Sequence, residues 1–335
     1  MNTKIEDDWN GFEKGDSLNN TGIVLKRYSA AIIPDCYIAM RMPGKVKSIA
    51  FGLSTGNLDA SSLSDLKEIT TEIIPNAIKS SKYLLLISLS DNSLASIFAV
   101  LSEDLFNYIS SIKQEDKIII ALQNRFLKWK ELFTIAVKRG LSAEEQIGLF
   151  GELYLLKMFF VKTGKIDKCL DIWVGPDAGI RDFEKDNSAI EVKTTQTHNQ
   201  QKIKISSERQ LDTSLLDNLF LFHLSLEKRN GTEYSLNTIV DEIYLIIKDD
   251  KLLINLFNYK LISAGYFKHQ RHIYENISYI VRDEGFYKIS DDFLRIEEKD
   301  LRKGVGDVKY SIVLTSGLEK YKSDLSCIIK KFELQ

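Results

Sequence analysis

The stretch 181-RDFEKDNSAIEVKTTQ-196 has the pattern of a β-hairpin that carries acidic side chains on both of its strands. Asp186 and Asn187 tolerate left-handed backbone conformations, so we expect the turn at these two residues. Pairing outward from this turn predicts four cross-strand pairs: Lys185 with Ser188, Glu184 with Ala189, Phe183 with Ile190, and Asp182 with Glu191. The last pair sets two carboxylates against each other, and directly opposed like charges are destabilising.

A divalent cation between the two carboxylates would remove this repulsion. Period-two alternation sends Ile190 and Val192 to one face of the strand, and Glu191 and Lys193 to the other. Mg²⁺ takes oxygen ligands, commonly one or two carboxylates with water and phosphate oxygens. Asp182 and Glu191 are therefore the predicted metal ligands, and the backbone carbonyl of Val192 is a further one. Lys193 would orient or help deprotonate an attacking water and stabilise charge on a phosphate, which predicts metal-dependent hydrolysis of phosphodiesters.

A buried helix is predicted just before the hairpin. Ser142 and Glu145 have the spacing of a capping box, and Gly164 is expected to end the helix. The segment 147-IGLFGELYLLKMFFV-161 is apolar on nearly every face, which indicates burial on all sides. Glu152 lies in the middle of this run, and a buried carboxylate requires a partner, a cation or access to solvent. It is a third candidate for the site.

The competing interpretation is an ordinary hairpin with Glu-x-Lys on its solvent face, which is common on protein surfaces. Three features favour a functional site instead: the position of Asp182 opposite Glu191, the apolar second face of the hairpin, and the isolated Glu152 upstream.

The order of elements from Ser142 to Leu226 resembles the core of the PD-(D/E)XK nuclease superfamily: a helix, a hairpin with Asp and then Glu-x-Lys, a second helix and a strand. The segments GLSAEEQIGLFGELYLL, W-x-GP, DF…AIEVKTT and ERQLD are similar to a bacterial family of PD-(D/E)XK restriction-system proteins. The similarity covers most of the chain. The Pro of the superfamily name is absent, because Ile180 and Arg181 precede Asp182.

The resemblance implies an α/β (α+β) fold with a restriction-endonuclease-like core, in which helices flank a mixed sheet. It also implies that Asp182 and Glu191 bind the metal, that Lys193 is the catalytic lysine and that Glu152 is an accessory acid. The implied activity is that of a metal-dependent deoxyribonuclease. Its cofactor would be Mg²⁺, for which Mn²⁺ can substitute.

The length of 335 residues predicts two domains, or one domain with a large extension. We expect a β-rich N-terminal region at residues 1–125, the nuclease core at 126–263 and an α+β C-terminal region at 264–335. Helices are predicted at residues 121–136, 207–212, 238–263 and 316–332. The apolar run 83–101 is interrupted by polar residues and predicts two buried elements, not a membrane span.

The composition indicates a cytoplasmic protein without membrane association. Cys36, Cys169 and Cys327 are far apart and form no CxxC pair, which is typical of a reducing compartment. The acidic N-terminal segment does not have the pattern of a secretory signal. A net charge of −2 neither supports nor excludes binding to DNA. The sequence contains no GxSxG serine-hydrolase motif and no GxxxxGK[ST] phosphate-binding loop.

DNA is the expected partner. The candidate phosphate-contacting residues are Gln196, Lys202, Lys204, Lys268 and Arg271. Cleavage of both strands requires two active sites, so we expect a homodimer or a larger complex. The resemblance implies a role in restriction or phage defence, with a DNA methyltransferase and an ATPase as partners. The alternative hypotheses are a DNA-binding subunit with an idle site, and a scaffolding subunit of a defence complex.

Overall fold

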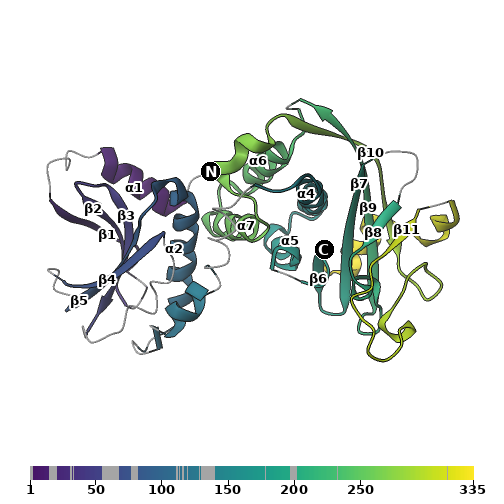
Figure 1. Cartoon of the computed structure of the whole chain (residues 1–335), viewed down its shortest axis with the longest axis horizontal. Helices are drawn as coiled ribbons and strands as arrows, with labels where there is room; N and C mark the ends of the chain where they lie inside the picture. The colour runs from purple at the N-terminus through teal and green to yellow at the C-terminus, as the bar shows by residue number, and fades with distance from the viewer. Residues whose placement is uncertain are drawn as a thin grey trace. The chain divides into compact units, whose positions relative to one another are not determined.

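The structure is a computed structural model that describes residues 3–14, 21–30, 32, 34–54, 68–76, 82–110, 112, 114, 117–118, 120–127, 129, 140–177, 179–196, 202–231, 233–314 and 316–335. The chain forms two compact units, each described here by itself (Figure 1). The N-terminal unit comprises Met1–Gly140 and Ile254–His269, and the C-terminal unit comprises Leu141–Leu253 and Gln270–Gln335.

The N-terminal unit is β-rich, as predicted. Its antiparallel sheet has the order β1-β2-β3-β5-β4, with β1 at Gly22–Arg27, β2 at Cys36–Met42, β3 at Val46–Leu53, β4 at Ile69–Pro75 and β5 at Tyr83–Leu89. Helices α1 (Lys4–Lys14) and α2 (Ala95–Ile109) share a buried apolar cluster with this sheet. Trp9 is fully buried in that cluster and donates its indole N–H to the carbonyl of Ala39. The two elements predicted within residues 83–101 are therefore β5 and α2.

The C-terminal unit is built on a mixed sheet, as predicted for the nuclease fold. The sheet has the order β12-β10-β9-β7-β6, and β7 and β9 are its parallel pair. The strands are β6 at Phe183–Lys185, β7 at Ser188–Gln196, β9 at Asn218–Asn230, β10 at Ile277–Lys288 and β12 at Lys322–Ser323. Figure 1 shows α4 (Ala143–Thr163), α5 (Ile166–Ile172) and α6 (Leu236–Ile247) on one side of this sheet. The paired strands β8 (Lys202–Ile205) and β11 (Tyr310–Val313) lie on the other side.

Short elements connect these layers. Further helices in the described part of the chain include α7 at Lys251–Ser263 and α8 at Leu325–Lys331, with 3-10 helices at Asn92–Leu94, Gly175–Asp177, Glu208–Leu211, Lys268–Tyr274, Glu298–Asp300 and Ser316–Tyr321. The unit boundaries differ from the three expected regions, because strand pairing is not local in sequence. β10 and β12 complete the sheet that carries the hairpin, whereas most of α7 belongs to the N-terminal unit.

The hairpin has the predicted register in the three pairs nearest its turn, which are Phe183 with Ile190, Glu184 with Ala189, and Lys185 with Ser188. Asp186 adopts the left-handed conformation expected of the turn, with φ of 49°. The ladder begins at Phe183, so Asp182 lies just outside it, where its side chain is free to turn toward β7.

The termini of α4 are also as predicted. The Ser142 hydroxyl accepts a hydrogen bond from the backbone N–H of Glu145, and the Glu145 carboxylate accepts one from the backbone N–H of Ser142. Gly164 ends the helix with φ of 66°, a conformation that glycine adopts without steric strain.

Two predicted helices are interrupted in the structure. Residues 238–263 form α6 and α7, because the Asp250 carboxylate accepts hydrogen bonds from Leu252 and Leu253 N–H groups and starts a new helix. Within residues 316–332, Asp324 caps α8 in the same way, after a 3-10 helix and the short strand β12. The helix predicted at residues 121–136 is helical at 121–127 and 129, and its remainder lies outside the described residues.

Gly151 is the point of closest approach between α4 and β7. A Cβ atom at Gly151 would lie 1.9 Å from the Thr194 Oγ1 atom and 3.2 Å from the Thr194 Cβ atom. We expect Gly151→Ala to lower the free energy of unfolding by about 1–3 kcal/mol, because neither element can move apart without losing packing. Urea unfolding would measure the loss.

Gly148 offers a matched control on the same helix, because a Cβ atom there would meet nothing within 4 Å. Gly148→Ala is expected to stabilise the protein by about 0.5–1 kcal/mol through helix propensity alone. Equal effects of the two substitutions would contradict the close packing of α4 on β7.

Candidate active site

Asp182 is held at the open end of the hairpin by its own backbone and side chain. Its carbonyl oxygen accepts hydrogen bonds of 2.9 Å from the N–H groups of Val174 and Gly175. Its Oδ2 atom accepts one of 2.7 Å from the N–H of Val192. The carboxylate is therefore fixed against the backbone of β7 next to Glu191, although Asp182 and Glu191 do not form the cross-strand pair that the sequence predicted.

Glu191 and Lys193 form a buried ion pair on β7. The Lys193 Nζ atom lies 2.6 Å from the Glu191 Oε1 atom, and Glu191 is only 1% exposed. The second carboxylate oxygen, Glu191 Oε2, is buried and has no hydrogen-bond partner among the described residues. A buried oxygen without a donor is unfavourable, so this atom is suited to receive a ligand.

Glu152 has the partner that its burial requires. The indole N–H of Trp173 donates a 2.8 Å hydrogen bond to its Oε2 atom. A Cβ atom at Gly175 would lie 2.9 Å from that same oxygen and 3.1 Å from Asp182 Oδ1. The absence of a side chain at Gly175 thus leaves space next to both carboxylates, and α4 contributes its acid to the hairpin.

All three carboxyl groups have raised pKa values, and burial is the main cause in each. Burial and the neighbouring Asp182 charge raise the pKa of Glu191 to about 8. Burial raises the pKa of Asp182 to about 6, although the Val192 N–H opposes this shift. Burial and the Asp182 charge raise the pKa of Glu152 well above its usual range. Burial therefore disfavours the charged forms of these acids more than the surrounding donors favour them.

The residues present fit a hard divalent cation. Asp182 and Glu191 offer carboxylate oxygens, of which Glu191 Oε2 lacks any donor in the described part of the chain. Across the described ranges, no group of three or more His, Cys, Asp or Glu side chains is arranged to hold a metal ion. Mg²⁺ does not need one, because it is commonly bound by one or two carboxylates and completes its shell with water and phosphate.

Two residues that the sequence analysis did not single out also contact the site. The Gln210 Oε1 atom accepts a 3.1 Å hydrogen bond from Lys193 Nζ. The Arg181 guanidinium donates to the carbonyls of Arg209, Gln210 and Asp212 at 2.9, 3.1 and 2.7 Å. Gln210 lies in the ERQLD segment, which is similar to the family, and Arg181 directly precedes Asp182, but neither position indicates a role by itself.

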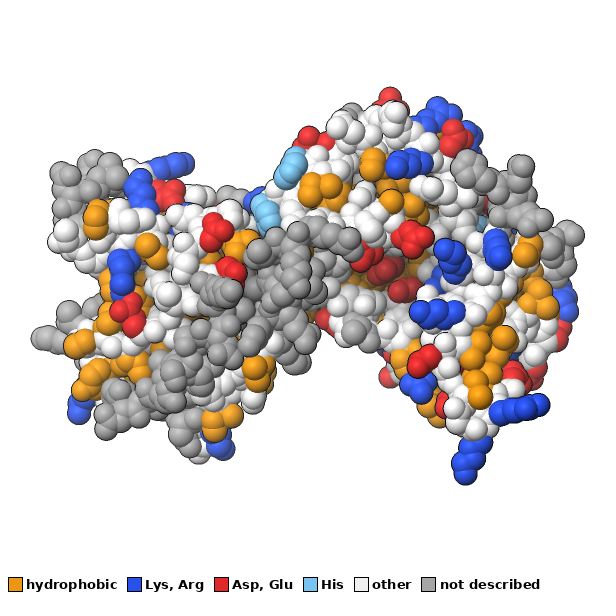
Figure 2. Space-filling view, viewed as in Figure 1, with side chains coloured by type: hydrophobic (Ala, Val, Ile, Leu, Met, Phe, Trp, Pro, Cys, Tyr) orange, Lys and Arg blue, Asp and Glu red, His pale blue; other side chains and the backbone are white. Residues whose placement is uncertain are grey.

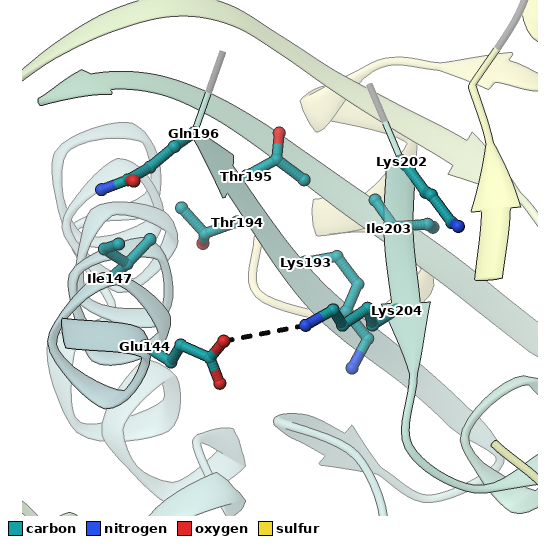
Figure 3. A pocket seen from close by; sticks show the side chains of 9 residues that line it. All are labelled: Glu144, Ile147, Lys193, Thr194, Thr195, Gln196, Lys202, Ile203 and Lys204. Carbon is teal, nitrogen blue, oxygen red and sulfur yellow. Dashed lines mark ion pairs between the residues drawn. The ribbon is translucent and has the colours of Figure 1, made fainter. Parts of the chain in front are cut away.

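Three of the five predicted DNA-contacting residues lie together. Gln196, Lys202 and Lys204 line a pocket of about 310 Å³ that also includes Lys193 (Figure 3). Figure 3 shows the pocket open between the N-terminal end of α4 and strands β7 and β8, with Glu144 paired to Lys204 at 3.7 Å. In the space-filling view, acidic side chains are recessed in the C-terminal unit, with Lys and Arg side chains beside them (Figure 2).

The other two predicted contacts are engaged elsewhere. Lys268 belongs to the N-terminal unit, where its Nζ atom lies 3.8 Å from Glu6 Oε1. Arg271 forms a bidentate pair with Asp241 at 2.8 and 2.6 Å. The structure does not bring either of them to the pocket that contains Lys193.

Comparison with known proteins identifies one family. Residues 5–315 match the family described as "Putative PD-(D/E)XK family member, (DUF4420)". No curated protein and no solved structure matches the chain. In the described part of the chain, no helix is long and apolar enough to span a membrane.

Proposed function

We propose that this chain, which belongs to the DUF4420 family of PD-(D/E)XK proteins, is a Mg²⁺-dependent DNA endonuclease. Membership by itself indicates a nuclease-like protein. The metal, the substrate and the biological role are our proposal, and they rest on the site in the C-terminal unit.

The observation that carries the proposal is the pair of acids Asp182, at the open end of the hairpin, and Glu191, on β7, with a lysine beside them. Asp182 Oδ2 is bound to the Val192 N–H, while Glu191 Oε1 is bound to Lys193 and Glu191 Oε2 is left without a donor. A surface Glu-x-Lys pair would be exposed and would not have raised carboxyl pKa values. This burial favours a ligand site over the ordinary hairpin.

The residues have distinct proposed roles. Asp182 and Glu191 would hold the cation, and the Val192 carbonyl is a further candidate ligand. The bound metal would supply Lewis-acid stabilisation and a more acidic water. Lys193 would orient the attacking water and stabilise negative charge at the phosphate. Glu152 would accept hydrogen bonds from water near Asp182, from its position beside Gly175.

The pocket next to Lys193 supports DNA as the substrate. Gln196, Lys202 and Lys204 project from β7 and β8 around it, and lysines of this kind contact phosphates without reading the sequence. We further propose that cleavage serves restriction or phage defence, in a homodimer or in a complex with a methyltransferase and an ATPase.

The test is cleavage of plasmid DNA by the purified protein, with Mg²⁺, Mn²⁺ or EDTA, beside an Asp182→Ala variant. We expect cutting with either metal, no cutting in EDTA, and a loss of about 10²-fold or more in the variant, because a metal-binding acid is removed. Methylated and unmethylated plasmids should be cut at different rates if the protein acts in restriction.

Two outcomes would contradict the proposal. DNA binding that survives EDTA, without cleavage under any metal, would favour a DNA-binding subunit with an idle site. Absence of DNA binding, together with stable co-purification with another protein of the cell, would favour a scaffolding role.

A further inference from the structure

The side chain of Gln210 is fixed by two donors that meet at one oxygen. Its Oε1 atom accepts the 3.1 Å hydrogen bond from Lys193 Nζ and a 2.9 Å hydrogen bond from the backbone N–H of Ser206. Both donors are unambiguous, since an ammonium and an amide N–H can only donate. The orientation of the Gln210 amide is therefore determined by its surroundings, and its oxygen faces the lysine.

Gln210, as a second acceptor, restricts the position of the Lys193 ammonium group. The ammonium group stands at the end of a flexible stem, and one partner alone would leave it free to follow Glu191. Gln210 gives it a second, separate anchor, so the direction of its third N–H is restricted as well. The anchor is neutral, and it adds no charge to a site that already holds three carboxyl groups.

Arg181 ties this anchor to the hairpin. Its guanidinium, only 11% exposed, donates to three carbonyls at the end of the 3-10 helix that carries Gln210. Arg181 directly precedes Asp182 in the chain. Arg181 therefore couples the position of the hairpin to that of the 3-10 helix that carries Gln210. This coupling would retain the spacing between Asp182 and Lys193.

We propose that Gln210 is a positioning residue for Lys193, and that it holds the ammonium toward the scissile phosphate while Arg181 holds the helix of Gln210 in place. The effect of Gln210 on catalysis rests on the proposed nuclease function, whereas its contact with Lys193 does not. The contact between Gln210 and Lys193 also predicts how fast a reagent modifies Lys193. This rate can be measured whether or not the protein cuts DNA.

The first readout is the rate at which an amine-specific reagent modifies Lys193, measured by mass spectrometry with exposed Lys330 as the internal reference. We expect Gln210→Ala to raise this rate about threefold or more, because the amine loses one of its two acceptors and is less restrained from reaching the reagent. Gln210→Glu should lower the rate, since a carboxylate at the same position would hold the Lys193 amine in a second ion pair. Leu215→Ala, at an 86% exposed position just beyond the 3-10 helix, should leave the rate unchanged.

The second readout is cleavage of a short DNA duplex. We expect Gln210→Ala to lower kcat about 10–100-fold with little change in KM, and to leave the metal-induced rise in Tm intact, because neither metal ligand is altered. Gln210→Glu should retain more activity than Gln210→Ala, because its carboxylate can still accept a hydrogen bond from Lys193. A structural defect would instead lower Tm and alter both variants alike.

The outcomes separate the two proposals. Unchanged modification of Lys193 in both Gln210 variants would overturn the positioning role, whether or not the protein cuts DNA. Changed modification with unaltered kcat in an active enzyme would overturn its catalytic effect. A wild-type protein that never cuts DNA would refute the nuclease function, while the modification rates would still decide whether Gln210 holds Lys193.

Discussion

Replacing Lys193 with Met is expected to lower the rate of DNA cleavage about 10²–10⁴-fold, the range found when a positioned charge-stabilising or proton-transferring group is removed. The ammonium lies 2.6 Å from Glu191 and 3.1 Å from Gln210, so it is anchored beside the proposed metal ligands. Met retains the unbranched apolar stem and removes the charge. Single-turnover cleavage of a duplex in Mg²⁺ would measure the loss, and a thermal shift with Mn²⁺ would show whether the metal still binds.

Lys204 provides the matched control on the neighbouring strand. It lines the same pocket, but its side chain is 79% exposed and pairs loosely with Glu144. We expect Lys204→Met to weaken DNA binding a few-fold and to reduce the dependence of binding on salt by about one counterion, with kcat retained. Equal loss of kcat in both variants, or full activity of Lys193→Met, would contradict a special role for Lys193.

The features that could be predicted from the sequence are those set by local chemistry. Asp186 and Asn187 fix the turn, and period-two alternation then fixes the register of β6 and β7. Ser142, Glu145 and Gly164 mark the ends of α4 through hydrogen bonds within a few residues. These rules act over short distances in the chain, so the structure confirms them residue by residue.

The contacts of the site that could not be predicted depend on elements far apart in sequence. The 3-10 helix brings Gln210 within hydrogen-bond distance of Lys193, and Arg181 contacts that helix across 28 to 31 residues of the chain. Trp173 supplies the donor for Glu152 from the segment between helix and hairpin. A pattern of residue types does not predict such contacts between distant segments, although it can show that buried Glu152 needs a partner.

Charge alone was also a poor guide to DNA contacts. Lys268 and Arg271 lie in a basic, aromatic segment, which suggested a phosphate-binding surface. In the structure both have carboxylate partners, and Lys268 lies in the N-terminal unit. Lys202 and Lys204 alternate with buried Ile203 and Ile205 on β8, and it is the pairing of β8 with β11 that presents them beside Lys193.

The buried acids should make the metal-free protein less stable as the pH rises. The pKa of Glu191 is raised from 4.5 to about 8, and that of Asp182 from 3.8 to about 6. Between these limits the native protein keeps protons that the unfolded chain has released. The contribution of both groups to stability is therefore complete below the lower values and is lost as the pH rises through about 6 and then about 8.

Glu191→Gln is expected to remove the larger part of this loss. At about pH 8.5 the metal-free variant should be more stable than wild type by on the order of 1 kcal/mol or more, because an amide needs no proton to remain neutral. Tm in EDTA at several pH values would show it as a flatter profile. Glu144→Gln is the control, since its carboxylate is 89% exposed on the same unit.

The Glu191→Gln variant should also lose the stabilisation by a divalent metal and the cleavage of DNA. A divalent cation competes with protons for Asp182 and Glu191, so Mn²⁺ should raise the wild-type Tm more at about pH 8.5 than at about pH 5.5. Glu191→Gln should abolish most of that gain together with DNA cleavage. If Mn²⁺ stabilised both proteins equally, or if the variant were the less stable of the two at high pH, the opposed carboxylates would not be a metal site. The placement of the Asp182 and Glu191 carboxylates next to each other would then need another explanation.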